Sequence, residues 1–173
     1  MKKTFLAVVM AGSFMAMTGL AHAADGTVKF TGNIVADACA VDTASKDMTV
    51  ALGDVATTTF SAAGDKASPT KFTINLTDCP STVKQVAVKF DGTSDSVNTN
   101  LLKLDSSMTA TNVGIEIADS NGTAIPLHTA SSEYAVAADG TAALNFVGRY
   151  VSTAASVGAG TANGTSQFTL NYQ

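Results

Sequence analysis

Apolar and polar residues alternate with a period of two in many short segments of this chain, and this pattern constrains its fold most. Successive side chains of a β-strand point to opposite faces, so the alternation indicates strands that bury one face. The segments are rich in Val, Ile, Phe, Thr and Tyr, which favour strands. They span residues 27–34, 71–77, 83–90, 113–117, 142–150 and 167–172. The pattern predicts an all-β fold without a convincing helix.

Residue pairs that suit tight turns separate these segments. Asn-Gly and Asp-Gly tolerate the positive φ angles that hairpins need. The turn pairs are Gly64–Asp65, Asp91–Gly92, Asn121–Gly122, Asp139–Gly140 and Asn163–Gly164. A stretch rich in Gly, Ala, Ser and Thr, residues 152–165, is interpreted as a loop before the final strand. Many short strands with closely spaced turns predict a β-sandwich of immunoglobulin type.

The first residues have the features of an export signal. Lys2 and Lys3 precede an uncharged, mostly apolar run over residues 4–20, and Ala21-His22-Ala23 is a small-x-small cleavage site. This order is typical of a secretory signal peptide, here residues 1–23. The alternative is a membrane anchor, which the Gly and Ser within the run and the immediate cleavage site disfavour.

Two cysteines, Cys39 and Cys79, follow the predicted signal. An even cysteine count in an exported chain predicts a disulfide. The bond would close a loop of about 40 residues and stabilise the fold by roughly 4 kcal/mol in the chain-entropy model. A thiol pair or half of a metal site is the alternative. A metal needs further ligands, which the single histidine after the signal, His128, does not supply.

Charge and motifs exclude several functions. Only 14% of residues are charged and the formal net charge is −4, without the clustered Lys and Arg that nucleic acids or anionic membranes attract. No apolar run after the signal is long enough to span a bilayer. His128 lies near a turn without a recognisable nucleophile motif, and residues 119–122 form a hairpin turn rather than a calcium loop. We expect neither an enzyme nor a cofactor.

One strand-like segment, Ala24 to Ala36, lies before the first cysteine. In an extended chain, Val28, Phe30, Gly32 and Ile34 share one face. The alternation alone leaves two interpretations open, because the strand could complete its own domain or pair elsewhere.

Four segments carry a family resemblance. They are residues 26–42 (GTVKFTGNIVADACAVD), 111–119 (TNVGIEIAD), 145–150 (NFVGRY) and 168–173 (FTLNYQ). Together they resemble the chaperone–usher pilins, in particular the major subunits of type 1 fimbriae. Each motif is weak alone, but the combination is specific and covers essentially the whole chain after the signal.

The resemblance implies an incomplete immunoglobulin-like β-sandwich that lacks its last strand. The missing strand leaves a hydrophobic groove beside an exposed edge, which is prone to uncontrolled pairing. In such pilins a periplasmic chaperone lends a strand to the groove. At an outer-membrane usher, the N-terminal extension of the next subunit replaces it, which is donor-strand exchange by β-augmentation.

The resemblance also implies roles for residues of this chain. Residues 24–36 correspond to the N-terminal extension and residues 37–173 to the pilin domain. The family disulfide corresponds to Cys39 and Cys79. The donor residues correspond to Val28, Phe30, Gly32 and Ile34. The chaperone and groove edge corresponds to Gly160, Phe168, Leu170 and Tyr172.

The resulting hypothesis is a structural subunit of a bacterial fimbrial shaft that supports adhesion. The chain would pass through the periplasm to the cell surface and polymerise with copies of itself. One alternative is a minor or adaptor pilin of the same system. A second is a self-contained periplasmic β-sandwich that binds a ligand or acts as an enzyme. Such a protein would be monomeric without a chaperone and would tolerate loss of residues 24–34.

Overall fold

The computed structural model describes residues 26–32, 34 and 38–173. The chain divides into two units, residues 1–34 and 35–173, and each is described by itself. The predicted signal peptide lies outside the described residues. In the first unit, residues 26–32 and 34 carry no regular secondary structure and are exposed.

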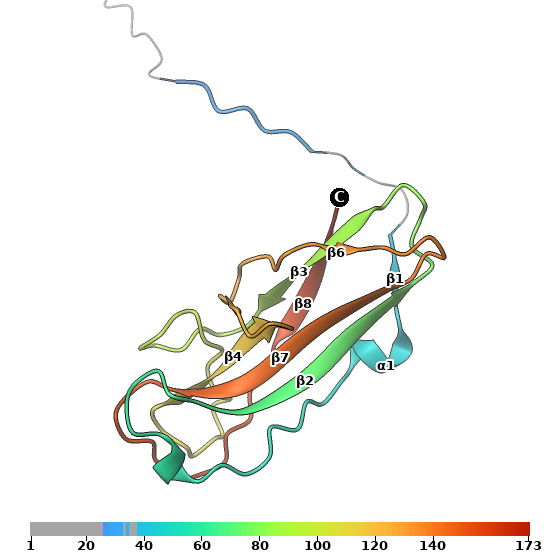
Figure 1. The fold of residues 1–173 in the computed structure, drawn as a ribbon. Helices are drawn as coiled ribbons and strands as arrows, with labels where there is room; N and C mark the ends of the chain where they lie inside the picture. Colours follow the sequence, from blue (N-terminus) through green and yellow to red (C-terminus); the bar gives the residue numbers. More distant parts are fainter. Residues whose placement is uncertain (1–25, 33, 35–37) are drawn as a thin grey trace, which may run out of the picture. The chain divides into compact units, whose positions relative to one another are not determined.

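The larger sheet of the second unit has five antiparallel strands. Its order is β1 (Ala40–Val41), β2 (Lys66–Thr77), β7 (Ala142–Ser152), β4 (Val113–Asp119) and β5 (Ala124–Ile125) (Figure 1). The long strands β2 and β7 form its centre, with Ile74 opposite Leu144 and Phe72 opposite Phe146. These inner residues are apolar at every second position, which is why one face of the sheet closes a core.

The smaller sheet has three strands, in the order β6 (Tyr134–Ala135), β3 (Gln85–Asp91) and β8 (Gln167–Tyr172). All of its pairings are antiparallel. Within residues 38–173 the helical elements are α1 (Thr43–Lys46), whose Asp42 side chain accepts a hydrogen bond from the Ala44 N–H, and the 3₁₀ turn η1 (Thr57–Thr59). Both are too short to change the class, and the predicted all-β sandwich is confirmed.

Aromatic rings fill the space between the two sheets. The Phe146 ring centroid lies 5.0 Å from that of Phe90, 5.5 Å from that of Phe72 and 5.4 Å from that of Tyr134. Val86, Val88 and Leu144 around them are fully buried. Each such side chain contributes about 1.5–3 kcal/mol on burial, so the core is centred where β3 faces β2 and β7.

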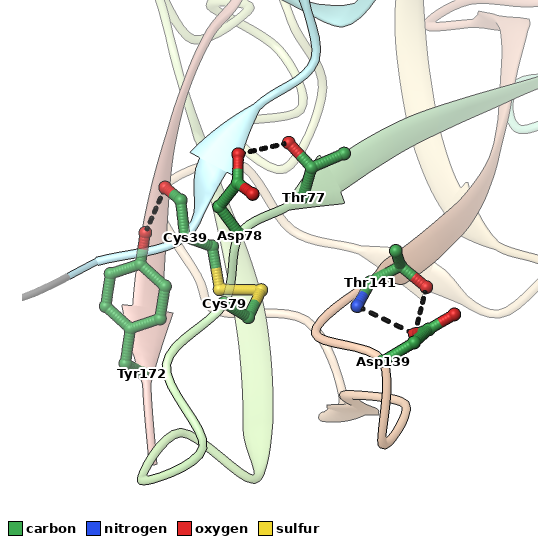
Figure 2. Close-up of a disulfide and its surroundings, with 7 residues drawn as sticks. All are labelled: Cys39, Thr77, Asp78, Cys79, Asp139, Thr141 and Tyr172. Atoms are coloured by element: carbon green, nitrogen blue, oxygen red, sulfur yellow. Dashed lines mark hydrogen bonds between the residues drawn. A yellow bond between two sulfur atoms is a disulfide. The ribbon is translucent and has the colours of Figure 1, made fainter.

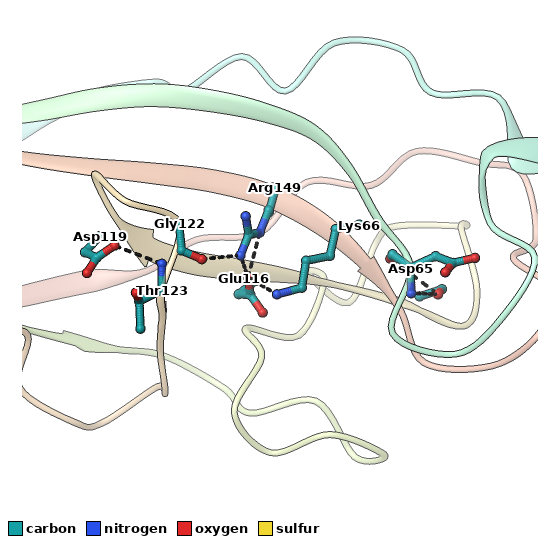
Figure 3. A network of polar contacts seen from close by, with 8 residues as sticks. Asp65, Lys66, Glu116, Asp119, Gly122, Thr123 and Arg149 are labelled. Atoms are coloured by element: carbon teal, nitrogen blue, oxygen red, sulfur yellow. Dashed lines mark hydrogen bonds and ion pairs between the residues drawn. The ribbon is translucent and has the colours of Figure 1, made fainter.

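The outer face of the larger sheet carries a polar cluster instead (Figure 3). The buried carboxylate of Glu116 on β4 accepts a hydrogen bond from Arg149 Nε at 2.6 Å and pairs with Lys66 Nζ at 3.1 Å. Arg149 also donates to the Gly122 carbonyl at 2.8 Å, and Asp119 closes the predicted hairpin by accepting from the Thr123 N–H. The cluster therefore ties β2, β7, β4 and the turn after β4 together.

No helix in the described part of the chain is both long enough and apolar enough to cross a membrane.

Candidate functional site

Strand β8 is paired along only one of its edges in the described chain. Its neighbour is β3, with Phe168 opposite Phe90, Leu170 opposite Val88 and Tyr172 opposite Val86. The sheet order places β8 last, and no described strand pairs with its other edge. We call this the open edge of β8. Unpaired N–H and C=O groups along such an edge are a template for another strand.

The side chains of β8 alternate between two environments. Gln167, Thr169 and Asn171 are exposed, whereas Phe168, Leu170 and Tyr172 point to the core but are only half-buried. Their partners on β3 are 4% exposed or less. The apolar face of the small sheet therefore continues to the open edge, where nothing in the described chain fully covers it.

Residues 48–54 lie across a hollow from the start of β8, and we call them the wall segment. Met48, Val50 and Leu52 are half-buried and alternate with exposed residues, although no strand is assigned there. A Cβ built on Gly148 of β7 would lie 3.6 Å from a Leu52 methyl and 3.9 Å from a Val50 methyl. The glycine thus leaves the floor beneath the wall segment free of a side chain.

A hollow of about 590 Å³ lies between the wall segment and the start of β8. Its apolar lining comes from both sheets and includes Phe72, Phe90, Ile115, Ile117 and Phe168. A second hollow of about 460 Å³ is lined by residues 157–163 of the loop before β8, and it shares five lining residues with the first: Gly53, Asp54, Tyr150, Ala162 and Asn163.

Tyr150 stands where the two hollows meet. Its hydroxyl donates to the Ala162 carbonyl at 2.9 Å, which holds the loop before β8 against β7. Burial, and secondarily the charge of Asp54, raises the pKa of Tyr150. The phenol is therefore neutral at physiological pH and acts as a hydrogen-bond donor.

The disulfide closes the other end of this region (Figure 2). The structure joins Cys39, just before β1, to Cys79, just after β2, as predicted. The Tyr172 hydroxyl donates to the Cys39 carbonyl at 3.5 Å, and burial raises the pKa of this tyrosine. The Cys79 N–H donates to the carbonyl of Gly140, in the turn before β7, at 2.9 Å. The final residues of β8 therefore lie beside the start of the domain.

Gly160 lies apart from the three apolar residues of β8. It sits in the loop before β8 and lines the second hollow. A Cβ there would lie 2.4 Å from both the Ala110 nitrogen and the Thr109 hydroxyl. Any side chain at this position would displace the loop, so the close approach of two backbones accounts for the glycine.

The four predicted donor residues lie in the first unit. Val28 is 77% exposed, Phe30 91% and Ile34 fully exposed, and these three with Val97 are the exposed large apolar side chains of the described residues. A Cβ on Gly32 would meet no atom within 4 Å. An apolar face that could be buried is therefore left in water.

His128 has partners that the sequence did not reveal. Its Nδ1 lies 2.9 Å from the Asp91 carboxylate, and its Nε2 lies 3.4 Å from the Ser94 hydroxyl. The hydrogen bond from His128, and then that from Lys89, lowers the pKa of Asp91. Asp91 is the last residue of β3, and the side chains of Asp91, Ser94 and His128 are all at least partly exposed, so these contacts link the end of β3 to the segments that carry Ser94 and His128. Nowhere in the described ranges do three His, Cys, Asp or Glu residues form a group that could hold a metal ion.

Sequence reasoning missed the wall segment and Gly148. The alternation of Met48, Val50 and Leu52 was a usable signal, but it spans only five residues and pairs with no strand. Gly148 could not be recognised as a floor residue without the positions of Val50 and Leu52 above it.

Comparison with known proteins places the chain in a class of assembly subunits. Residues 28–173 match the fimbrial protein family. The chain is 42% identical to the type-1 fimbrial protein A chain of Salmonella typhi, over 93% of this chain and 94% of that protein. A crystal structure of an antigen and type I fimbria protein of Burkholderia pseudomallei has 35% identity and a TM-score of 0.62, over 85% of this chain and 97% of that one. The P pilus rod subunit PapA, 19% identical, shares the fold with a TM-score of 0.64, over 79% of this chain and 100% of that one.

The chain therefore belongs to the fimbrial protein family. It is a structural subunit of a surface fimbria rather than an enzyme, and it is exported to the cell surface as part of that fimbria. Neighbouring pilin subunits are its partners. The predictions of family, fold class, general function and location are confirmed.

Proposed function

We propose that this subunit builds a fimbrial shaft by donor-strand exchange, in which residues 24–36 of one copy fill the groove of the next. The groove lies between the open edge of β8 and the wall segment in the domain formed by residues 37–173. One observation carries the proposal. Phe168, at one end of the half-buried face that it forms with Leu170 and Tyr172, lines an apolar hollow, while Val28, Phe30 and Ile34, which would share one face of an extended strand, are exposed.

Burial would drive the exchange. Phe30 and Ile34 would each gain about 1.5–3 kcal/mol when they leave water. The open edge of β8 would gain a ladder of backbone hydrogen bonds at the same time. Val28 to Ile34 spans seven residues and β8 spans six, so the two segments match in length.

Side-chain direction restricts the register. The inward residues of both segments have even numbers, and inward residues must lie opposite one another in a paired face. We favour antiparallel pairing, because every named strand pair of the described sheets is antiparallel. We take the antiparallel register in which Val28, Phe30 and Gly32 lie opposite Tyr172, Leu170 and Phe168, so that the glycine faces a bulky ring. Ile34 lies just beyond Phe168, over the first hollow.

Before exchange, the same open edge would be covered by a strand from a periplasmic chaperone, and an outer-membrane usher would bring two subunits together. The support for these two partners is the unprotected apolar edge and the family to which the chain belongs. In this proposal Phe168, Leu170 and Tyr172 contact the chaperone. Gly160 contributes by keeping the loop at the end of the groove in place.

Cysteine cross-linking between copies tests both the exchange and its direction. Lys29 and Asn171 point outward and lie opposite each other in the antiparallel register. Copies with Lys29→Cys and Asn171→Cys together should form disulfide-linked ladders in isolated fibres. Gln167→Cys, which would face Lys29→Cys in a parallel register, is the matched control.

The outcomes separate the parts of the proposal. Ladders from the Lys29→Cys/Asn171→Cys pair but not from the Lys29→Cys/Gln167→Cys pair support the antiparallel register. The opposite result would show that the extension pairs parallel to β8. If neither pair forms ladders although the fibres are intact, the proposed register at the edge of β8 is wrong.

A further inference from the structure

The wall segment has no backbone partner among the described hydrogen bonds. Two bonds attach it to β2, and both are donated by hydroxyl groups. Ser68 Oγ donates to the Leu52 carbonyl, and Thr70 Oγ1 donates to the Ala51 carbonyl at 3.3 Å. Val50 and Leu52 add apolar contact above Gly148. The second side of the groove is therefore held by side chains, whereas β8 is held by a ladder.

Both hydroxyls project from an irregularity in β2. The pairing of β2 with β7 shifts register between Ala67 and Thr70, and Ser68 has a φ of +54°. Such left-handed backbone is uncommon for a residue other than glycine. Pro69 between them has no N–H to donate, and proline is tolerated in strands at bulges of this kind. The sequence Ser-Pro-Thr thus turns the hydroxyl groups of Ser68 and Thr70, on either side of the proline, toward the wall segment.

We infer that this bulge sets the width of the groove, with Ser68 and Thr70 as positioning residues for the wall segment during strand exchange. The inference rests on the proposed function above. The two hydroxyls hold the carbonyls of Ala51 and Leu52 at a fixed distance from β2, so that Met48, Val50 and Leu52 keep their inward direction. An incoming strand then meets a groove that is already open to the correct width. Without the two bonds, the wall segment relaxes over the hollow or away from it, and an entering strand must first reposition it.

The test uses the full-length chain, exported and assembled in cells, with fibres and unpolymerised subunit quantified separately over time. Ser68→Gly removes one hydroxyl and suits the positive φ, so it does not add backbone strain. Thr70→Val removes the other and preserves the branched shape. Thr70→Ser keeps a hydroxyl at this position. Thr73→Val is the matched control, because the Thr73 hydroxyl bonds Asn145 on β7 at 2.8 Å and does not touch the wall segment.

We expect the double variant Ser68→Gly/Thr70→Val to enter fibres about tenfold more slowly, since a net hydrogen bond commonly shifts an equilibrium severalfold. Thr73→Val and Thr70→Ser should assemble at the wild-type rate. The melting temperature of unpolymerised subunit should be the same for the double variant and for Thr73→Val. A general loss of stability would instead lower the melting temperature and the rate of assembly together.

Two results overturn the inference. One is a double variant that assembles at the wild-type rate. The other is a double variant whose slower assembly is matched by a loss of subunit stability. Leu170→Asp, assayed in parallel, tests the proposed function itself. If that variant still assembles normally, strand exchange at β8 is wrong and the role of the wall segment falls with it. If it fails to assemble while the double variant is normal, only the inference about Ser68 and Thr70 is wrong.

Discussion

Strands β7 and β8 have the same alternating pattern but very different burial. β7 lies between β2 and β4, and its inward residues Leu144 and Phe146 are at most 1% exposed. β8 has a neighbour on one side only, and its inward residues remain half-buried. The pattern of a strand therefore determines which face turns inward, whereas the number of its neighbours determines how far that face is buried. The difference separates residues that hold the domain together from residues that remain available to another chain.

Phe146→Ala should give the largest loss of subunit stability. Its ring contacts three other aromatic rings in the core, and such a truncation costs about 3–5 kcal/mol because a cavity remains. Denaturant unfolding of the unpolymerised subunit measures this loss. Phe168→Ala on β8 should cost clearly less in the same assay while still impairing fibre formation. Equal losses from both variants would contradict the distinction between the two strands.

Leu170→Asp should abolish assembly with a smaller effect on the fold than Phe146→Ala. The substitution places a charge on a face that must be desolvated by a chaperone or donor strand, which is strongly unfavourable for an unpaired charge. We expect no fibres, loss of chaperone co-purification and degradation in the periplasm. Thr169→Asp, on the exposed side of the same strand, is the control and should assemble. A Leu170→Asp subunit that accumulates normally and co-purifies with chaperone would show that this face is not the contact.

Gly32→Leu should slow strand exchange without changing the subunit that carries it. In the proposed register the new side chain meets Phe168, and overpacking of this kind costs about 1–3 kcal/mol. The measurement is the rate at which purified chaperone–subunit complexes polymerise. Thr31→Leu, on the opposite face of the extension, provides the comparison and should polymerise at a rate near that of the wild type. Identical polymerisation rates for wild type and Gly32→Leu would show that residues 24–36 are not the strand that fills the groove.

The smallest effect should come from removing the carboxylate of Asp91, at the end of β3, and should appear as a change in the melting temperature at low pH. Asp91 accepts hydrogen bonds that lower its pKa below the usual 3.8, and its carbonyl accepts from Ser166 at 2.9 Å. A carboxylate with a lowered pKa stabilises the folded state above pH 3.8, and this contribution is lost as the pH falls through the folded-state value. Asp91→Asn should flatten the fall in melting temperature below about pH 4 slightly, because the group is exposed. A steeper fall in Asp91→Asn than in wild type would refute this assignment.

The sequence predicted β8 well because its pattern is local. Phe168, Leu170 and Tyr172 alternate with polar residues without interruption, so no partner was needed to identify their face. The strand β2 was predicted only from residue 71, because Pro69 has no N–H to donate to the ladder and interrupts the strand pattern over residues 66–70. The wall segment and Gly148 escaped prediction because their roles arise from packing across about a hundred residues of sequence. The pairing of Asp91 with His128 likewise depends on the end of β3 meeting a turn that is distant in the sequence.

The contact between Tyr172 and Cys39 has a consequence for symmetry. It places the point where the chain enters the domain beside the final residues of β8. In the proposed register, an incoming extension has its own domain attached at the opposite end of β8, beyond Phe168. Each subunit would therefore donate its own extension at one end and bind the extension of a neighbour at the other, through two different surfaces. Contacts of this head-to-tail kind have no twofold axis and can repeat without closing, so they generate a polar filament rather than a dimer.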